Sequence, residues 1–122
     1  MTKSDALLNF WSRFGLPAYY ETQFPENPEY PYITFEAADD SFGNTLYLSA
    51  SLWYRGKLWT DANAKAEEIS RYIGRDGVYI DFDNGSLYIQ RGSPFSQNMG
   101  DDFDEFIKRK ALQIEAEYLT ED

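Results

Sequence analysis

An alternating stretch in the middle of the chain, residues 45–54, most constrains what this chain can fold into. Its sequence is TLYLSASLWY, with an apolar side chain at every second position. A period of two places those side chains on one side of an extended strand, so the stretch predicts a long strand with one buried face. That face is expected to carry Leu46, Leu48, Ala50, Leu52 and Tyr54, and the other face Tyr47, Ser49, Ser51 and Trp53.

Apolar residues at helical spacing predict a first helix over residues 4–14. Ser4 is the expected N-cap, because its hydroxyl can accept a hydrogen bond from the first turn. Gly15 is expected to end the helix. The apolar stripe consists of Leu7, Leu8, Trp11 and Phe14.

A second helix is predicted over residues 60–73, capped by Thr60 or Asp61 and ended by Gly74. Its apolar stripe is narrow and made of small and β-branched residues, which lets a helix lie close to a sheet. The stripe consists of Ala62, Ala66, Ile69 and Ile73.

Residues 77–92 predict a β-hairpin, because Asn84 and Gly85 separate two alternating runs. A slip of one residue in the pairing would turn Ile80 and Phe82 away from the core. The expected pairs are Phe82 with Leu87, Ile80 with Ile89, and Val78 with Arg91. The opposite face would carry Tyr79, Asp81, Tyr88 and Gln90.

Short strands are predicted at residues 18–22 and 32–37, the second with Ile33, Phe35 and Ala37 facing inward. The prolines between them, Pro25, Pro28 and Pro31, indicate a stiff extended connector, and the alternative is a proline-rich ligand for an SH3-like domain. Residues 38–44 are expected to form an acidic turn, and residues 93–100 a loop.

The segment from residue 101 to residue 120 fits two patterns. Apolar residues at helical spacing run from Ile107 to Tyr118, yet residues 108–119 also alternate with a period of two. Because the edge of a sheet needs a partner, we choose a short helical turn over residues 102–106 followed by a strand over 108–119. The pattern alone leaves the helical alternative open.

The order of elements is therefore helix, three strands, helix and three strands. This order predicts one α+β domain over residues 1–122. Its sheet would be mostly antiparallel, with about five to six strands and with both helices packed on one face.

The composition narrows the possible chemistry. The chain has neither cysteine nor histidine, which excludes disulfides, thiolate catalysis and zinc sites built from those residues. Its net charge of −10 repels nucleic acid. No apolar run is long enough to span a membrane, and the first residues do not have the pattern of a signal peptide, so we expect a protein assembled in a cytoplasm.

Two acidic motifs are considered as sites. Residues 81–85, DFDNG, begin like a calcium loop, but the glycine comes one place early and Gly92 stands where the bidentate glutamate belongs. Asp39 and Asp40, or the acidic residues of 101–105, could form a carboxylate pair for hydrolysis, but acidic residues on a solvated surface or at a helix start explain them more simply. We therefore predict no metal, no cofactor and no catalytic residue.

The outward face of the predicted sheet is rich in aromatic residues interleaved with polar ones. Three interpretations stay open at this point: a solvated face, a platform on which sugars stack, and an interface with another protein. The residues are Tyr32, Tyr47, Trp53, Tyr79 and Tyr88.

The chain resembles the small tail-terminator proteins, also called tail-completion or head-to-tail joining proteins, of long-tailed phages and prophages of Gram-positive bacteria. The likeness covers nearly the whole chain and lies in the order and spacing of several segments. These are LNFWSRFGLPAYY at 8–20, YPYITF at 30–35, residues 42–53, residues 64–73, RGSPF at 91–95 and ALQIEAEYL at 111–119.

The resemblance implies a structural role and no catalytic residues. Subunits of that family form a ring, typically a hexamer, which caps the tail tube, ends its polymerisation and joins the tail to the head connector. It implies three partners: other copies of the chain, the major tail tube protein and the head-completion or connector protein. The protein would be located in the virion after assembly in the host cytoplasm, and DNA would pass through a negative bore without binding.

A ring requires two different contact patches on each subunit. We expect one on the aromatic sheet face and a contact with the tube in one of two loops. The alternative function is a small-ligand or carbohydrate-binding module that uses the same sheet face. The candidate interface residues are Tyr47, Trp53, Tyr79 and Tyr88 on the sheet, Phe42 in the acidic turn, and Phe95 and Met99 in the loop at 93–100.

Overall fold

The computed structural model describes residues 2–23, 25–38, 44–100 and 104–120. The candidate Phe42 and most of the expected acidic turn lie outside these residues, as does the first part of the helical turn expected at 102–106.

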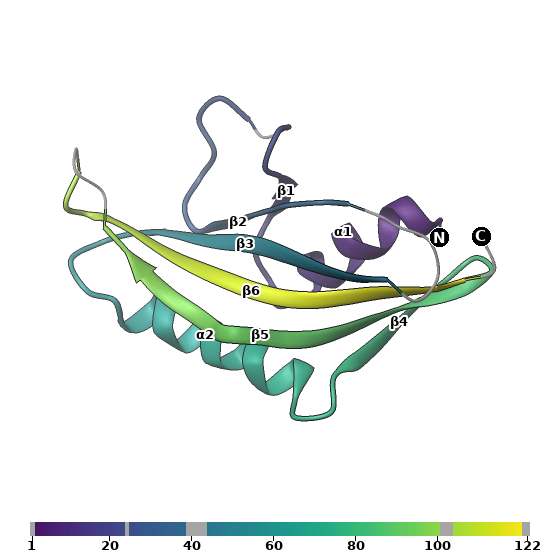
Figure 1. The fold of residues 1–122 in the computed structure, drawn as a ribbon. Coiled ribbons are helices and arrows are strands. Elements are labelled where there is room, and N and C mark those ends of the chain that lie inside the picture. The colour runs from purple at the N-terminus through teal and green to yellow at the C-terminus, as the bar shows by residue number, and fades with distance from the viewer. Residues whose placement is uncertain (1, 24, 39–43, 101–103, 121–122) are drawn as a thin grey trace.

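The described residues form a mixed α/β fold with one curled six-stranded sheet and two α-helices (Figure 1). The strand order is β1-β2-β3-β6-β5-β4. The pairing of β1 with β2 is parallel and the other four pairings are antiparallel. The strands are β1 (Ala18–Tyr20), β2 (Tyr32–Phe35), β3 (Thr45–Arg55), β4 (Val78–Phe82), β5 (Gly85–Met99) and β6 (Ile107–Thr120).

The long central strands β3 and β6 form the middle of the sheet. Their antiparallel register runs from Thr45 opposite Glu117 to Arg55 opposite Ile107. The strand predicted over 108–119 is therefore confirmed, and the helical alternative is wrong. Its place between β3 and β5 gives both of those strands a hydrogen-bonding partner, which satisfies backbone groups that a helix would have left open.

Both predicted helices are present, and Gly15 and Gly74 end the two helical segments as predicted, but the expected N-caps are wrong. The first is α1 (Ala6–Trp11), flanked by the short 3₁₀ helices η1 (Lys3–Asp5) and η2 (Ser12–Phe14), so that Ser4 lies inside η1. The second is α2 (Thr60–Ile73), whose N-cap is Trp59 and has no side-chain capping bond. The Trp59 ring lies 5.9 Å from the Lys108 Nζ, so a tertiary contact accompanies the start of this helix.

Side chains from both helices and from alternate strand positions form one hydrophobic core cluster. The two predicted helical stripes contribute to it, with Leu8 half-buried at its margin and Phe10 added to the first stripe. In β3 the prediction holds for the middle of the strand, while Leu46 and Tyr54 are half-buried. The fully buried larger residues include Trp11, Tyr118, Phe10, Phe35, Leu7, Ile33, Leu52, Ile69, Ile73, Leu87, Ile89 and Leu112.

Strand β2 departs from the predicted alternation. All four of its residues are buried, and the strand ends at Phe35, so that Ala37 is exposed rather than inward-facing. The reason is that large side chains on neighbouring strands also cover the outward face of β2, as described below for Tyr32 and Thr34.

The hairpin is confirmed, but its predicted register is wrong by two residues. Phe82 pairs with Gly85, and the two-residue loop is Asp83 and Asn84. Asn84 takes the left-handed conformation, with φ of 69°, so that Gly85 can begin β5. Each side chain still lies on its predicted face of the sheet, because a shift of two residues preserves the alternation. The other observed pairs are Ile80 with Leu87 and Val78 with Ile89.

The loop expected at residues 93–100 is wrong, because β5 continues to Met99. Its pairing with β6 is interrupted between Arg91 and Ser96 and then resumes. Pro94 lies in the interruption, where its missing N–H does not break the ladder of hydrogen bonds. The polar residues and the single proline of this segment therefore mark a bulge within a strand.

Among the described residues, no helix combines the length and the apolar character that crossing a membrane would require.

We predict that Gly77→Ala lowers the free energy of unfolding by about 1–3 kcal/mol, since a non-glycine residue is strained at this backbone conformation. Gly77 has φ of +82°, and an added Cβ would lie 2.7 Å from the Ile89 carbonyl oxygen and from the Tyr88 ring. Denaturant titration measures the difference. The matched control is Gly56→Ala, where no atom lies within 4 Å of the added Cβ; equal stability of the two variants would contradict the prediction.

Candidate functional site

The outward face of the sheet carries a row of side chains that crosses four strands, here called the Trp53 ladder. Tyr32 of β2, Trp53 of β3, Arg109 of β6 and Met99 of β5 are consecutive partners across the sheet. The Tyr32 and Trp53 rings stack with their centroids 6.0 Å apart and an interplanar angle of 12°. The Arg109 Cζ lies 5.1 Å from the Trp53 ring. Trp53 therefore has a neighbour on each side.

Two hydrogen bonds join side chains of the Trp53 ladder to polar side chains on neighbouring strands. The Trp53 Nε1 donates to the Thr34 Oγ1 at 2.9 Å, and the Arg109 Nε donates to the Ser51 Oγ at 3.0 Å. Thr34 and Ser51 are buried although they are polar, and these bonds satisfy their hydroxyl groups. The Trp53 ladder is thus a packed layer of side chains on the outward face of the sheet.

Tyrosine rings extend this layer beyond β2. Tyr30 and Tyr19 lie with their ring centroids 5.3 Å and 6.3 Å from that of Tyr32. Burial, which is the largest cause, and the neighbouring Tyr30 together raise the pKa of Tyr32 to about 12. The Tyr32 phenol therefore stays neutral in the folded protein to a higher pH than an exposed tyrosine.

A second aromatic pair lies at the β4 edge of the sheet. The rings of Tyr79 and Tyr88 stack at 4.6 Å. The Tyr88 hydroxyl donates to the Asp76 carbonyl oxygen at 2.5 Å, and its ring covers Gly77. Tyr88 therefore holds the connection between α2 and β4, while Tyr79 is 62% exposed.

Tyr47 is the most exposed ring on this face, at 74%. It lies opposite Glu115 of β6, and the next outward row places Glu117 beside Tyr88 and Tyr79. Two exposed tyrosines therefore flank two glutamates on the same side of the sheet.

The predicted interface residues on this sheet face thus differ in exposure. Tyr47 and Tyr79 are exposed, whereas Trp53 and Tyr88 are half-buried and held by neighbours. Met99 lies at the β5 end of the Trp53 ladder and is half-buried. Arg109 was not among the predicted interface residues, although its alternation with Lys108 and Lys110 already placed it on the outward face.

Phe95 lies elsewhere, since it packs against the core and lines a cleft of about 500 Å³ beside α2. In this cleft the Lys110 Nζ donates to the Asn63 Oδ1 at 2.7 Å and to the Asn98 Oδ1 at 2.8 Å. Desolvation by burial lowers the pKa of Lys110. The cleft therefore presents an ammonium group held by neutral amides.

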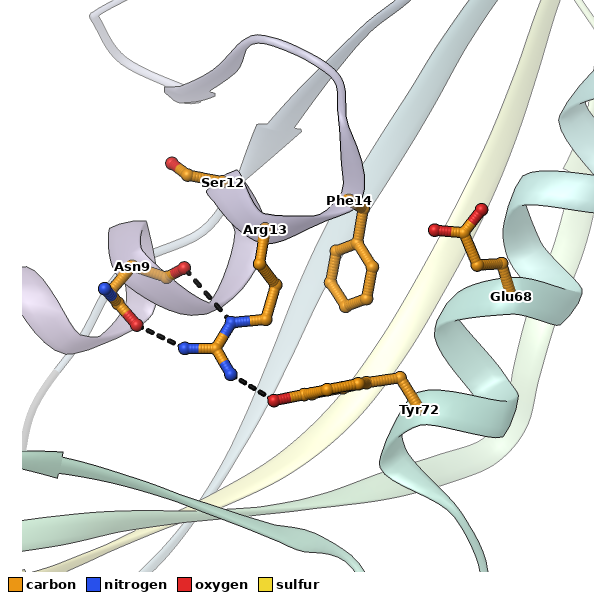
Figure 2. A pocket seen from close by; sticks show the side chains of 6 residues that line it. All are labelled: Asn9, Ser12, Arg13, Phe14, Glu68 and Tyr72. Carbon is orange, nitrogen blue, oxygen red and sulfur yellow. Dashed lines mark hydrogen bonds between the residues drawn. The ribbon is translucent and has the colours of Figure 1, made fainter.

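The residues of η1, α1 and η2 are here called the first helical segment. A larger cleft of about 560 Å³ lies between this segment and α2, and we call it the Arg13 cleft. The Arg13 guanidinium donates to the Asn9 side chain and to the Tyr72 hydroxyl (Figure 2). Tyr72 also contacts Phe14, with ring centroids 5.5 Å apart. The lining residues are Asn9, Ser12, Arg13, Phe14, Glu68 and Tyr72.

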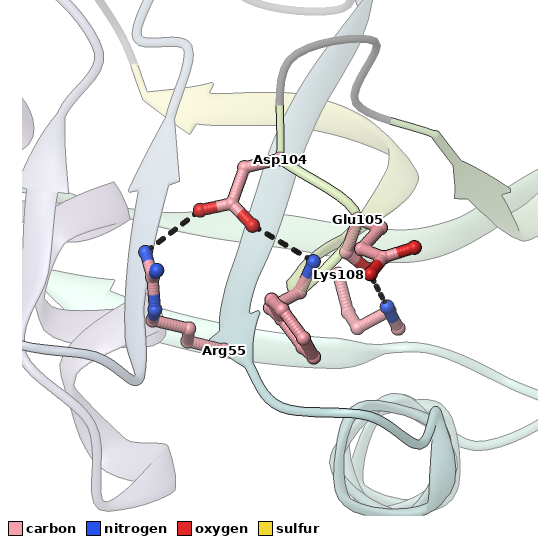
Figure 3. A network of polar contacts seen from close by, with 5 residues as sticks. Arg55, Asp104, Glu105 and Lys108 are labelled. Atoms are coloured by element: carbon pink, nitrogen blue, oxygen red, sulfur yellow. Dashed lines mark hydrogen bonds and ion pairs between the residues drawn. The ribbon is translucent and has the colours of Figure 1, made fainter.

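A polar network joins the ends of β3 and β6 (Figure 3). The Arg55 Nη1 lies 2.9 Å from the Asp104 Oδ2, and the Lys108 Nζ donates to the Glu105 carbonyl oxygen. The Phe106 N–H donates to the Asp104 Oδ1 at 2.9 Å. This network fixes the chain as it enters β6.

The acidic motifs do not assemble a site within the described residues. No group of three or more histidine, cysteine, aspartate or glutamate residues there is placed to hold a metal ion. Asp81 accepts a hydrogen bond from the Ser86 hydroxyl at 2.7 Å across the hairpin. Asp39, Asp40, Asp101 and Asp102 lie outside the described residues, so the proposal that the protein is not an enzyme stays a prediction.

A scan of the chain against protein-family models finds no match, and a search of curated proteins finds no matching sequence. The resemblance to tail-terminator proteins therefore stays a prediction.

We predict that Trp53→Ala lowers the free energy of unfolding by about 1–3 kcal/mol, since it removes an aromatic stack, a cation–π contact and a hydrogen bond. Tyr47→Ala is the control, because an exposed surface residue typically changes stability by about 0.5 kcal/mol or less. Thermal and denaturant unfolding of both variants measure the difference. Similar losses in the two variants would show that the ladder does not stabilise the sheet.

We also predict a pH effect from Tyr32. Between the ordinary tyrosine pKa of 10.0 and the folded value of about 12, the unfolded chain loses a proton that the folded chain keeps. The stability contributed by the neutral phenol is therefore complete below pH 10 and is lost as the pH rises towards 12. The Tyr32→Phe variant should lose stability less steeply over this range in denaturant titrations, and parallel losses would contradict the assignment.

Proposed function

We propose that this protein is a structural component of phage tails that forms a ring on the end of the tail tube, ends its polymerisation and joins it to the head connector. The observation that carries the proposal is the outward sheet face, on which Tyr47 and Tyr79 are strongly exposed beside an ordered aromatic layer. Exposed tyrosines on a rigid surface are typical of protein interfaces. The order of segments shared with tail terminators supports the same role.

The proposal includes an arrangement in which both helices cover the same face of the sheet. Its support is the single core cluster, in which residues of α1 and α2 join the inward positions of the strands. The opposite positions then remain for contact with other subunits. The half-buried Tyr88 stacks on Tyr79, and Trp53 packs in its ladder farther along β3, so that Tyr47 and Tyr79 would provide the contact rings of this surface.

The charge of the chain agrees with passage of DNA through a ring. Each subunit carries a net charge of −10, and a negative bore repels phosphate rather than binding it. The expected partners are other copies of the chain, the tail tube protein and the head connector. Assembly would take place in the bacterial cytoplasm, and the finished ring would lie in the virion at the junction of head and tail.

The carbohydrate-binding alternative has less support in the geometry. A sugar stacks on an open ring face, but Trp53 already stacks on Tyr32 and contacts Arg109. Tyr47 and Tyr79 are the exposed rings that remain on this sheet face within the described residues.

We predict that replacing Tyr47 and Tyr79 together by serine prevents ring formation and leaves the subunit folded. Both rings are exposed, so their loss removes contact area at little cost to stability. Sedimentation and negative-stain imaging would be carried out with the protein alone and with purified tail tubes.

The matched control is Leu58→Ser, which removes an equally exposed apolar side chain in the segment between β3 and α2. The unmodified protein and this control should form rings or cap tubes, and the double variant should do neither. Rings of the double variant would exclude the tyrosines as contacts. Failure of the unmodified protein both to form rings and to cap tubes would overturn the proposed function itself.

A further inference from the structure

The Arg13 cleft contains a guanidinium whose orientation is set by neutral groups. The Arg13 Nη2 donates to the Asn9 Oδ1, its Nη1 to the Tyr72 hydroxyl, and its Nε to the Asn9 carbonyl oxygen at 3.5 Å (Figure 2). The Cζ also lies 5.3 Å from the Tyr72 ring. Arginine has five N–H donors. Two of them therefore have no acceptor within the part of the chain that the structure describes.

The positive charge of Arg13 has no carboxylate partner among the described residues. The ion pairs of that part of the chain join Arg55 to Asp104, Lys65 to Glu68, and Arg71 to Glu67. Glu68 also lines the Arg13 cleft, but its carboxylate lies 3.0 Å from the Lys65 Nζ. Because Lys65 balances that charge, the cleft keeps a net attraction for an anion beside Arg13.

An aromatic surface adjoins the guanidinium. Phe14 packs edge-on against Tyr72 at 5.5 Å and against Phe10 at 5.4 Å. Phe14 and Phe10 are buried, whereas Tyr72 is 42% exposed and lies outside the buried stripe of α2. The Arg13 cleft thus presents a guanidinium group beside the accessible ring of Tyr72, which packs against the buried Phe14.

We propose that the Arg13 cleft binds an acidic–aromatic segment of another protein, with a carboxylate on Arg13 and an adjacent aromatic side chain against Tyr72. The guanidinium fork matches a carboxylate with two parallel hydrogen bonds. Most side chains that line the cleft are exposed, so it would enclose a free small molecule poorly. A side chain presented by a larger partner needs no such enclosure. The inference does not depend on the proposed role in phage tails.

The competing explanation is that Arg13 only joins the first helical segment to α2. Both explanations predict that Arg13 contributes to stability, but only the proposal predicts recognition of a carboxylate. The probe is therefore a fluorescein-labelled peptide, Gly-Asp-Phe-Asp-Gly, and its neutral counterpart is Gly-Asn-Phe-Asn-Gly. Fluorescence anisotropy with the full-length protein measures both affinities.

We expect saturable binding of the acidic peptide and about tenfold weaker binding of the neutral one, since hydrogen bonds to charged groups are the stronger kind. Arg13→Gln should weaken binding of the acidic peptide by about the same factor. The matched control is Arg75→Gln, which removes an exposed positive charge just after α2 and should leave binding unchanged. Thermal unfolding confirms that each variant is folded.

If Arg13→Gln fails to fold, Arg13→Lys serves instead, because it keeps the charge, loses the fork and should bind the acidic peptide more weakly than the unmodified protein. Equal affinity for the two peptides would overturn the proposal, as would equal binding by the Arg13 and Arg75 variants or an absence of saturable binding. Self-association of the unmodified protein that Arg13→Gln abolishes would also overturn it, by showing that a second copy occupies the cleft.

Discussion

The rest of the structure depends on the antiparallel pairing of β3 with β6. On one side of these strands, Leu48, Ala50 and Leu52 belong to the hydrophobic core, as do Ile114 and Leu112, the β6 partners of the first two. On the other side, the same pairing places Arg109 beside Trp53. Because β6 also pairs with β5, it connects the β1-β2-β3 part of the sheet to the β4–β5 hairpin. The non-local contact of the C-terminal strand therefore completes both the core and the outward face.

The outward face shows how one set of aromatic residues serves two physical roles. Trp53 donates a hydrogen bond to the buried Thr34 hydroxyl and stacks on the buried Tyr32 ring, so these two aromatic residues behave as a second, thinner packed layer. Tyr47 and Tyr79 stand on the same face without being covered. Aromatic side chains on paired strands lose little conformational entropy when a partner orders them, which is the physical basis for treating this face as an interface.

The first helical segment, through η2, meets α2 by aromatic and polar contacts as well as through the common core. Phe14 and Tyr72 join them by an edge-on ring contact, and Arg13 bridges them by its hydrogen bonds. Lys65 adds a bond of 2.7 Å from its Nζ to the Phe14 carbonyl oxygen, which satisfies a group at the end of η2. The Arg13 cleft is therefore a product of the way that α1 and α2 are held together, and it is separate from the tyrosines of the sheet.

Local periodicity by itself determined the long β3 strand, the buried stripes of both helices, the hairpin at Asn84 and the sides on which Tyr47 and Tyr79 stand. These features follow from spacings of two and 3.6 residues, which a linear sequence contains. Only the tertiary structure decided that β5 continues past Pro94, that the hairpin pairs Phe82 with Gly85, and that Trp53 is covered while Tyr47 is not. The physical reason is that register and burial depend on side chains from distant strands, and no local pattern specifies which of those strands become neighbours.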